Sequence, residues 1–148
     1  MAENDAATQA IHDIVHGLVA AWNRHDPRAF AAAFAEDADF TNVFGMAVKG
    51  RGAIEDLHAP IFKTMFRDSR LNVSETRIRF IRPDVAAVDI HWEMTGARDP
   101  LGNDWPARKG LLNLTMTEEQ GDWSIAVSHN MDLPSADLAK AQAALSER

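Results

Sequence analysis

The chain has 148 residues, with 22 acidic residues, 15 Lys or Arg and no cysteine, and its net charge is -7. Hydrophobic residues make up 46% of the chain and charged residues 25%, which excludes a disordered or collagen-like protein. The absence of cysteine excludes a disulfide framework, a thiolate nucleophile and a cysteine-based metal site. Acidic charge without a basic cluster argues against nucleic acid and anionic membranes as partners.

Length and the N-terminal residues set expectations for organisation and location. The chain begins Met-Ala-Glu-Asn-Asp, whereas a signal peptide begins with basic and then apolar residues. No stretch approaches the roughly 18 apolar residues of a membrane span, so we expect a cytoplasmic protein with no membrane partner. We predict one domain over residues 1–134, with residues 135–148 forming either a short terminal helix or a frayed tail.

The N-terminal part of the sequence predicts two helices. Apolar residues recur at helical spacing over residues 5–24, which indicates one long amphipathic helix. Asp26 followed by Pro27 is typical of a helix start, since aspartate can accept from free backbone N–H groups and proline loses nothing at the first helical position. A short second helix with Phe34 on its apolar face is therefore expected.

A strand and a third helical segment follow. Residues 39–44 alternate weakly and are rich in Phe and Val, which favours a strand. Residues 53–66 have a helical pattern. Pro60 is expected to end or kink that helix near Ala59, because its ring clashes with the carbonyl four residues back.

The second half of the sequence predicts strands. The strongest period-2 pattern runs over residues 88–95, and a long loop with two Pro and two Gly follows it over residues 96–109. Helices followed by strands predict an α+β fold, with three N-terminal helical segments on one face of a curved, mostly antiparallel sheet. The other expected strands cover residues 71–80 with an irregularity, 111–117 and 123–131.

Several segments resemble the NTF2-like superfamily. They are Ala21-Trp22-Asn23-Arg24-His25-Asp26, the run from Phe30 to Phe40, Gly50-Arg51-Gly52-Ala53-Ile54 and Gly121-Asp122-Trp123-Ser124-Ile125. The segments Ser128-His129-Asn130 and Asn42-Val43-Phe44-Gly45 are most similar to the SgcJ/EcaC type of SnoaL-like proteins. The resemblance implies a cone-shaped fold whose sheet encloses a deep pocket for a hydrophobic small molecule, and a homodimer formed through the outer face of the sheet.

The superfamily contains isomerases, epoxide hydrolases, polyketide cyclases, dehydratases and noncatalytic binders, so the resemblance does not define one activity. The position that matches the proton-shuttling aspartate of ketosteroid isomerase is Asn42, and an amide cannot act as a general base. The matching oxyanion positions are Leu18 and, approximately, Asn113. A steroid isomerase mechanism is therefore not expected.

Four polar residues are expected to share the pocket and to form a catalytic group: Asn42, His58, Asn113 and His129. A neutral histidine accepts a proton near pH 7, so His129 is predicted to act as a base or polariser and His58 as a second donor or acid. The two asparagines would orient a water or a substrate oxygen. Alternatively, the histidines are core residues with one hydrogen bond each, and the amides only connect strand ends.

Apolar residues are expected to line the rest of the pocket, because ligand cavities are mostly apolar with a few directed polar groups. Some of these positions are implied by the resemblance to the isomerases and others come from strand alternation. The expected ligand-binding residues are Leu18, Trp22, Phe40, Phe62, Val88, Ile90, Trp92, Met94 and Val127. Trp105 in the long loop is either a lid over the pocket or an anchor of the loop.

No metal or cofactor is expected. Asp89, His91 and Glu93 have the spacing of ligands on one strand face, but that face lies opposite the apolar pocket wall. His12 and His16 are one helical turn apart and lack a carboxylate on the same face. The sequence also contains no glycine-rich phosphate motif and no nucleophile elbow.

These observations predict a cofactor-independent acid/base enzyme of isomerase, cyclase or hydratase/dehydratase type, which acts on a hydrophobic, oxygen-bearing metabolite. Two alternatives remain open. One is a noncatalytic binding or carrier protein for such a metabolite, and the other is a dimeric interaction module whose cavity is filled by its own side chains.

Overall fold

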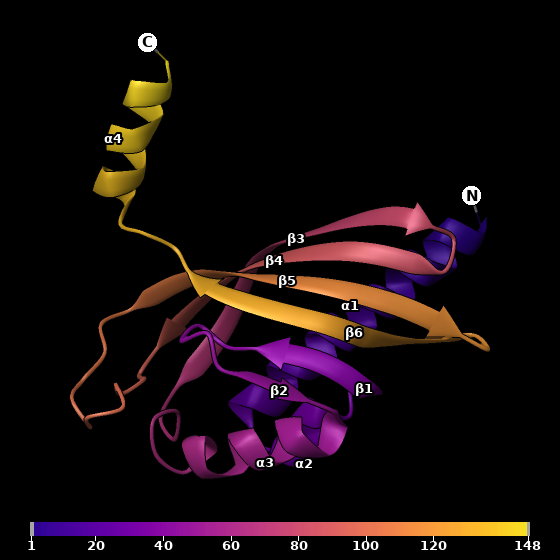
Figure 1. Cartoon of the computed structure of the whole chain (residues 1–148), viewed down its shortest axis with the longest axis horizontal. Helices are drawn as coiled ribbons and strands as arrows, with labels where there is room; N and C mark the ends of the chain where they lie inside the picture. Colours follow the sequence, from indigo (N-terminus) through magenta and orange to yellow (C-terminus); the bar gives the residue numbers. More distant parts are fainter. Residues whose placement is uncertain (1, 148) are drawn as a thin grey trace.

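The computed structural model describes residues 2–147 and has an α+β architecture, as the sequence predicts. A curved six-stranded sheet wraps around three N-terminal helices, and a fourth helix stands away from this body (Figure 1). In chain order the elements are α1 (Ala2–Asn23), α2 (Pro27–Ala31), β1 (Phe34–Thr41), β2 (Ala47–Lys49), α3 (Arg51–Phe62), β3 (Arg70–Arg82), β4 (Val85–Thr95), β5 (Arg108–Glu119), β6 (Asp122–Asp132) and α4 (Ala136–Ser146).

Helix α1 packs its apolar face against the concave side of the sheet. Ile11, Val15, Leu18 and Trp22 are all buried, at the helical spacing from which the helix was predicted. The end of α1 is fixed to β3 by Asn23, which donates to the Leu71 carbonyl (2.9 Å) and accepts from the Leu71 N–H (2.7 Å). This pair of bonds joins the C-terminal end of α1 to the start of β3.

Helix α2 is shorter than expected. It starts as predicted, with the Asp26 side chain accepting from the Ala29 N–H (3.0 Å) and Pro27 in the first turn. It ends at Ala31, and Phe34 is the first residue of β1 instead of a helical residue. The predicted strand therefore begins five residues too late, because Phe34 is buried by its place in the sheet and not by a helical face.

Of the two effects expected of Pro60, an end of the helix near Ala59 is not observed, since α3 continues to Phe62. Proline here occupies the last turn, where its missing N–H removes only one intrahelical bond before the helix ends. The short strand β2, which the sequence pattern did not reveal, pairs antiparallel with β1. β2 is thus the edge strand of the sheet, and α3 lies beside β1 and β2 (Figure 1).

The strands are arranged in the order β2-β1-β6-β5-β4-β3. All neighbouring pairs are antiparallel except β1 and β6, which run parallel. β4 has the predicted alternation, because Ala86, Val88, Ile90, Trp92 and Met94 are buried while the residues between them are only half-buried. The predicted irregularity in β3 is also present, as a register shift between Val73 and Glu75 opposite β4.

Residues 136–146 form a helix near the end of the chain. The Ser135 side chain accepts from the Leu138 N–H (3.2 Å) and so caps the first turn. None of the residues of α4 is buried, and the helix projects away from the sheet (Figure 1).

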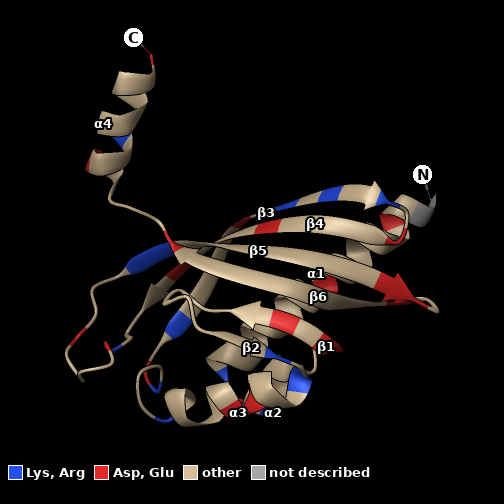
Figure 2. Ribbon diagram, viewed as in Figure 1, with Lys and Arg blue, Asp and Glu red and all other residues tan. Residues whose placement is uncertain are grey.

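The charged residues are distributed over the outside of the fold. Figure 2 shows Lys and Arg on several elements, including β3 and the start of β5, instead of in one patch. Within residues 2–147, none of the helices has the length and apolar character needed to span a membrane.

Candidate functional site

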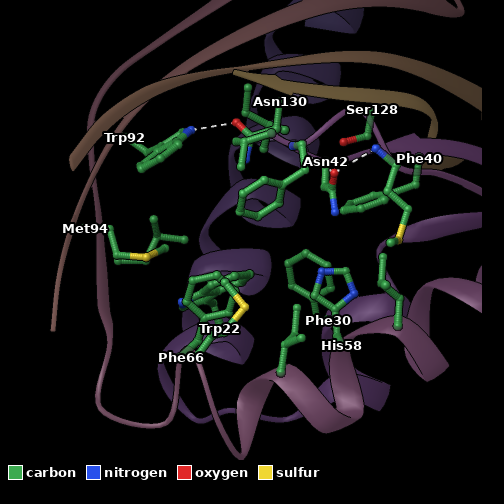
Figure 3. A pocket seen from close by; sticks show the side chains of 18 of the residues that line it. Trp22, Phe30, Phe40, Asn42, His58, Phe66, Trp92, Met94, Ser128 and Asn130 are labelled. Atoms are coloured by element: carbon green, nitrogen blue, oxygen red, sulfur yellow. Dashed lines mark hydrogen bonds between the residues drawn. The ribbon is translucent and has the colours of Figure 1, made fainter. Parts of the chain in front are cut away.

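A cavity of about 390 Å³ lies between the concave face of the sheet and helices α1 and α3 (Figure 3). Most of its lining is aromatic or aliphatic, including Trp22, Phe30, Phe40 and Trp92. The protein's own side chains do not fill this space, which argues against the filled cavity that the interaction-module alternative requires. Seven of the predicted site residues line the cavity: Leu18, Trp22, Phe40, Asn42, His58, Trp92 and Met94.

His58 is the titratable group in this apolar wall. It lies on α3, is 3% exposed, and packs its ring against Phe30 (4.4 Å between centroids) and Phe40 (5.1 Å). Its Nδ1 lies 2.7 Å from the Ile54 carbonyl oxygen, which can only accept, so Nδ1 carries the hydrogen and Nε2 keeps a lone pair. Burial lowers the pKa of His58 to about 4, although the bond to Ile54 acts in the opposite direction. The ring is therefore neutral at pH 7.

Asn42 lies one residue beyond the end of β1, where its side chain both shapes the backbone and reaches the cavity. Its Oδ1 accepts from the N–H groups of Phe44 and Met46, each at 2.9 Å. These two bonds determine the orientation of the carboxamide, because only the oxygen can accept. The Nδ2 group has no partner among the described residues, so it remains available as a donor to a ligand.

The prediction that His129 and Asn113 share this cavity is wrong. His129 is exposed, and the exposed Asn113 donates to Asp89 Oδ1 at 2.7 Å. Both residues lie on the outer face of the sheet, where they are register partners. Trp123, Ile125, Val127 and His129 are every second residue of β6, so a regular strand would place all four on one face. The expectation that His129 faces the cavity rested on this spacing.

The cause is a bulge in β6. Thr115 pairs with Val127 and the next residue, Met116, pairs with Ile125, so Ala126 is an extra residue without a partner on β5. The extra residue exchanges the two faces of the strand beyond it. Val127 consequently faces outward with His129, and its predicted contact with the ligand is wrong as well.

The same bulge turns Ser128 and Asn130 into the cavity, and the sequence analysis missed both. Ser128 is fully buried and its Oγ has no hydrogen-bond partner within the described part of the chain. Asn130 Oδ1 accepts from Trp92 Nε1 at 2.8 Å, which leaves its Nδ2 free (Figure 3). No local sequence signal marks the bulge, because Ala126 is compatible with a regular strand.

Three further predicted ligand-binding residues are buried without lining the cavity. Val88 and Ile90 do point to the concave side, but they belong to the part of β4 that packs tightly in the core. Phe62 packs against two residues that line the cavity. The centroid of its ring lies 4.9 Å from that of Trp22 and 5.5 Å from that of His58. The periodicity correctly predicted that these side chains are buried, but it could not show how far the cavity extends along the sheet and the helices.

Arg108 lines the cavity and stacks on Trp105, which belongs to the long loop between β4 and β5. The Arg108 guanidinium lies 3.6 Å from the centroid of the Trp105 ring and 5.3 Å from that of Trp92. Its Nε and Nη2 both donate to Asp132 Oδ1, at 3.0 and 2.8 Å. The stacked cation favours an anchoring role for Trp105 in the long loop between β4 and β5 over the role of a lid.

No group of three or more potential metal ligands converges anywhere in residues 2–147. His91 lies on the outer face, where its Nδ1 is 3.7 Å from Glu75 Oε2.

A sequence model of the SnoaL-like domain matches residues 15–122. The chain belongs to the SnoaL-like domain family. No functionally curated protein matches the chain. A solved structure of an uncharacterised protein with a cystatin-like fold from Caulobacter vibrioides is 29% identical, with a TM-score of 0.85 over 94% of this chain and 97% of that one.

Two more distant structures share the fold of this SnoaL-like domain. A domain with a cystatin-like fold from Nostoc punctiforme is 23% identical, with a TM-score of 0.78 over 95% of this chain and 86% of that one. The hexachlorocyclohexane dehydrochlorinase LinA-type3 from Novosphingobium barchaimii is 16% identical, with a TM-score of 0.78 over 90% and 93% of the two chains. The predicted NTF2-like cone fold is confirmed.

The cavity of this SnoaL-like domain therefore has an apolar interior and two polar sides (Figure 3). On the side of the sheet, Asn42, Ser128 and Asn130 supply hydrogen-bonding groups. On the opposite side, His58 on α3 supplies a neutral ring nitrogen. None of the cavity-lining residues that the structure describes is a carboxylate, so a histidine is the group available to accept a proton.

Proposed function

We propose that this SnoaL-like protein binds a mainly apolar small molecule in the cavity and acts on it as a cofactor-independent acid/base enzyme, with His58 as the proton acceptor. The proposal rests on the unpartnered Nε2 of His58, a basic nitrogen in a mostly apolar cavity whose described lining contains no carboxylate. The specific reaction is an isomerisation, cyclisation, hydration or dehydration, all of which need a proton to be moved.

The dimensions of the cavity support the binding part of this proposal. A volume of about 390 Å³ falls within the roughly 300–1,000 Å³ that small-molecule sites occupy in proteins. Its aromatic lining favours an apolar ligand body, since burial of apolar surface drives association. Assignment to the SgcJ/EcaC type remains a prediction that rests on the two motifs quoted above.

The environment of His58 supports the catalytic part. Because its pKa lies near 4, the imidazole is unprotonated and able to accept a proton over the whole neutral range. The hydrogen bond from Nδ1 to the Ile54 carbonyl holds the tautomer that presents Nε2 as the base. The same low pKa makes His58 a weak base, so the substrate proton must be acidic or must become so on binding.

A generic proton-transfer probe tests the proposal without knowledge of the natural substrate. We would measure the elimination of 5-nitrobenzisoxazole, in which a base removes the C3 proton and the N–O bond breaks to give a coloured phenolate. Saturable turnover should rise with pH through about 4 and remain constant above pH 6, because the neutral ring is the active form. His58→Gln should abolish it, whereas His129→Gln should leave it unchanged, since His129 lies on the outer face.

The second candidate is a noncatalytic binding or carrier protein. The low pKa of His58 and the absence of a carboxylate from the described cavity lining favour it, because a strong base is not needed for binding. Saturable binding of an apolar ligand without turnover of the elimination probe would support this candidate. Absence of binding as well would contradict both candidates.

A further inference from the structure

Three polar groups meet along the seam between β1 and β6, on the strand side of the cavity. The parallel register pairs Phe40 with Ser128 and Thr41 with His129, so Asn42 reaches the same edge of the cavity as Asn130. In Figure 3 Asn42, Ser128 and Asn130 lie together on this side, opposite the helix that carries His58. We call Asn42, Ser128 and Asn130 the polar seam.

The hydrogen bonds already present determine what the polar seam offers to a ligand. The Asn130 oxygen faces Trp92 Nε1, which can only donate, and the Asn42 oxygen faces two backbone N–H groups. Both carboxamides therefore have their acceptor atoms occupied and their N–H groups free. The oxygen and nitrogen of an isolated carboxamide can exchange positions. Here the hydrogen bonds to the two oxygens leave the N–H groups of Asn42 and Asn130 available as donors to a ligand.

Ser128 contributes a hydroxyl group to the polar seam. Its hydroxyl is fully buried in the cavity wall, and no described residue accepts its hydrogen. An unsatisfied buried hydroxyl is destabilising compared with an alanine that fills the same space. The other fully buried serine, Ser69, differs in that it accepts from Trp22 Nε1 (3.1 Å) and donates to the Phe66 carbonyl (2.8 Å).

The charge of the cavity limits the ligand further. Arg108 is the single Lys or Arg among the described cavity-lining residues, and Asp132 neutralises it. A ligand carboxylate would therefore have no free cation to pair with, and burying an unpaired charge is costly. A neutral acceptor avoids this cost.

We propose that the polar seam is a recognition site for a neutral carbonyl group, with Ser128 as its specificity-determining residue and the free amide groups of Asn42 and Asn130 as further donors. The ligand is thus an apolar ketone, ester or related carbonyl compound whose oxygen lies against β6. This inference rests on the proposed function of the cavity as a small-molecule site and narrows its ligand class.

Equilibrium dialysis with two matched probes tests the inference. 2-Acetonaphthone carries the carbonyl, and 2-ethylnaphthalene has a similar shape without the oxygen. We expect the wild-type protein to bind the ketone at least as tightly as the hydrocarbon. Ser128→Ala should weaken binding of the ketone by about 5- to 10-fold and leave binding of the hydrocarbon unchanged, since one hydrogen bond is removed.

The unfolding midpoints of two serine variants show whether Ser128 has a merely structural role. Ser128→Ala should unfold at the same or a higher denaturant concentration, because its hydroxyl is unsatisfied in the folded protein. Ser69→Ala should unfold at a lower concentration, because it loses two hydrogen bonds. A loss of stability in Ser128→Ala comparable to that in Ser69→Ala would overturn the inference.

The binding outcomes separate the inference from the proposed function. If both probes bind and Ser128→Ala affects them equally, the cavity is a small-molecule site but the carbonyl assignment is wrong. If neither probe binds the wild-type protein, the proposed function and the inference fail together.

Discussion

The indole ring of Trp92 lies directly against the backbone of Gly110, its register partner on β5. A Cβ atom at position 110 would overlap atoms Cζ2 and Cε2 of the ring, so only glycine leaves room for the indole in this orientation. The same orientation lets Trp92 Nε1 donate to Asn130 Oδ1 at 2.8 Å. The absence of a side chain at Gly110 therefore allows the observed orientation of the Trp92 ring, and through it the hydrogen bond that positions Asn130.

Gly110→Ala is expected to destabilise the protein by about 1–3 kcal/mol, because the added methyl group displaces the Trp92 ring from a packed site. Urea unfolding measures the change, and ligand binding should weaken with it. The matched control is Gly17→Ala in the exposed middle of α1, where a Cβ meets nothing within 4 Å. That variant should be stabilised by about 0.5–1 kcal/mol, since alanine favours a helix. Equal effects of the two substitutions would contradict the packing described here.

Stability should fall as the pH decreases from about 6.5 to about 4, in part because of His58. The unfolded chain protonates this residue near its ordinary pKa of 6.5, whereas burial keeps it neutral in the folded protein down to about pH 4. Protonation therefore favours the unfolded state within that window, by up to about 3 kcal/mol at its acidic end.

The difference in unfolding free energy between the wild-type protein and His58→Gln isolates this effect from other titrating groups. Measured at pH 7, 6, 5 and 4, the advantage of the wild-type protein over the variant should decrease steadily. Parallel stability curves for the two proteins would show that His58 is not buried in a neutral form.

Arg108→Met should loosen the long loop between β4 and β5. The substitution removes two hydrogen bonds to Asp132 and the contact with Trp105, for an expected loss of about 1–3 kcal/mol. Hydrogen exchange should become faster in residues 96–107. The neighbouring Lys109→Met is the control, because its ion pair with Glu93 is long (3.6 Å) and exposed and contributes less than about 0.5 kcal/mol. Unchanged exchange in Arg108→Met would contradict the role of Trp105 as an anchor.

Removal of residues 135–148 should leave the unfolding midpoint unchanged. None of the residues of α4 is buried, and a helix that buries no surface contributes little to the stability of the domain. Thermal unfolding of the truncated and full-length chains tests this prediction. A lower midpoint after truncation would mean that α4 packs against the domain or a partner in solution.

A homodimer through the outer face of the sheet remains a prediction that follows from the family resemblance. Arg77, Asp89, Asn113, His129 and Thr41 form a continuous row across five strands of this face. Light scattering should give twice the chain mass of 16.3 kDa. Asn113→Arg, in the middle of the row, should favour the monomer, whereas Asp56→Arg on the exposed surface of α3 should not. A monomeric wild-type protein would refute the prediction.

Local patterns were enough to predict the α+β fold and the apolar face of β4, and the family resemblance implied that this face forms the cavity wall. The alternation of Trp92 and Met94 with polar residues depends only on the pleat of one strand, and Leu18 and Trp22 depend only on the pitch of one helix. These four residues were predicted from the sequence and line the cavity. Asn42 and His58 were likewise placed correctly, with the help of the family resemblance.

Other features depended on the environment of a residue and not on its neighbours in the chain. Pro60 is tolerated in α3 because of where the helix ends, and Phe34 is a strand residue because β6 provides its partner Ile125. The low pKa of His58 likewise arises from burial among aromatic rings that come from different elements.

The sequence by itself determined the α+β class and the residues of β4 that face the core, because periodicity is a local property of the chain. Only the tertiary structure decided that Ser128 and Asn130, and not His129, enter the cavity. The extra residue Ala126 is visible only in the pairing of β6 with β5, and this pairing determines which face of the strand each later side chain occupies.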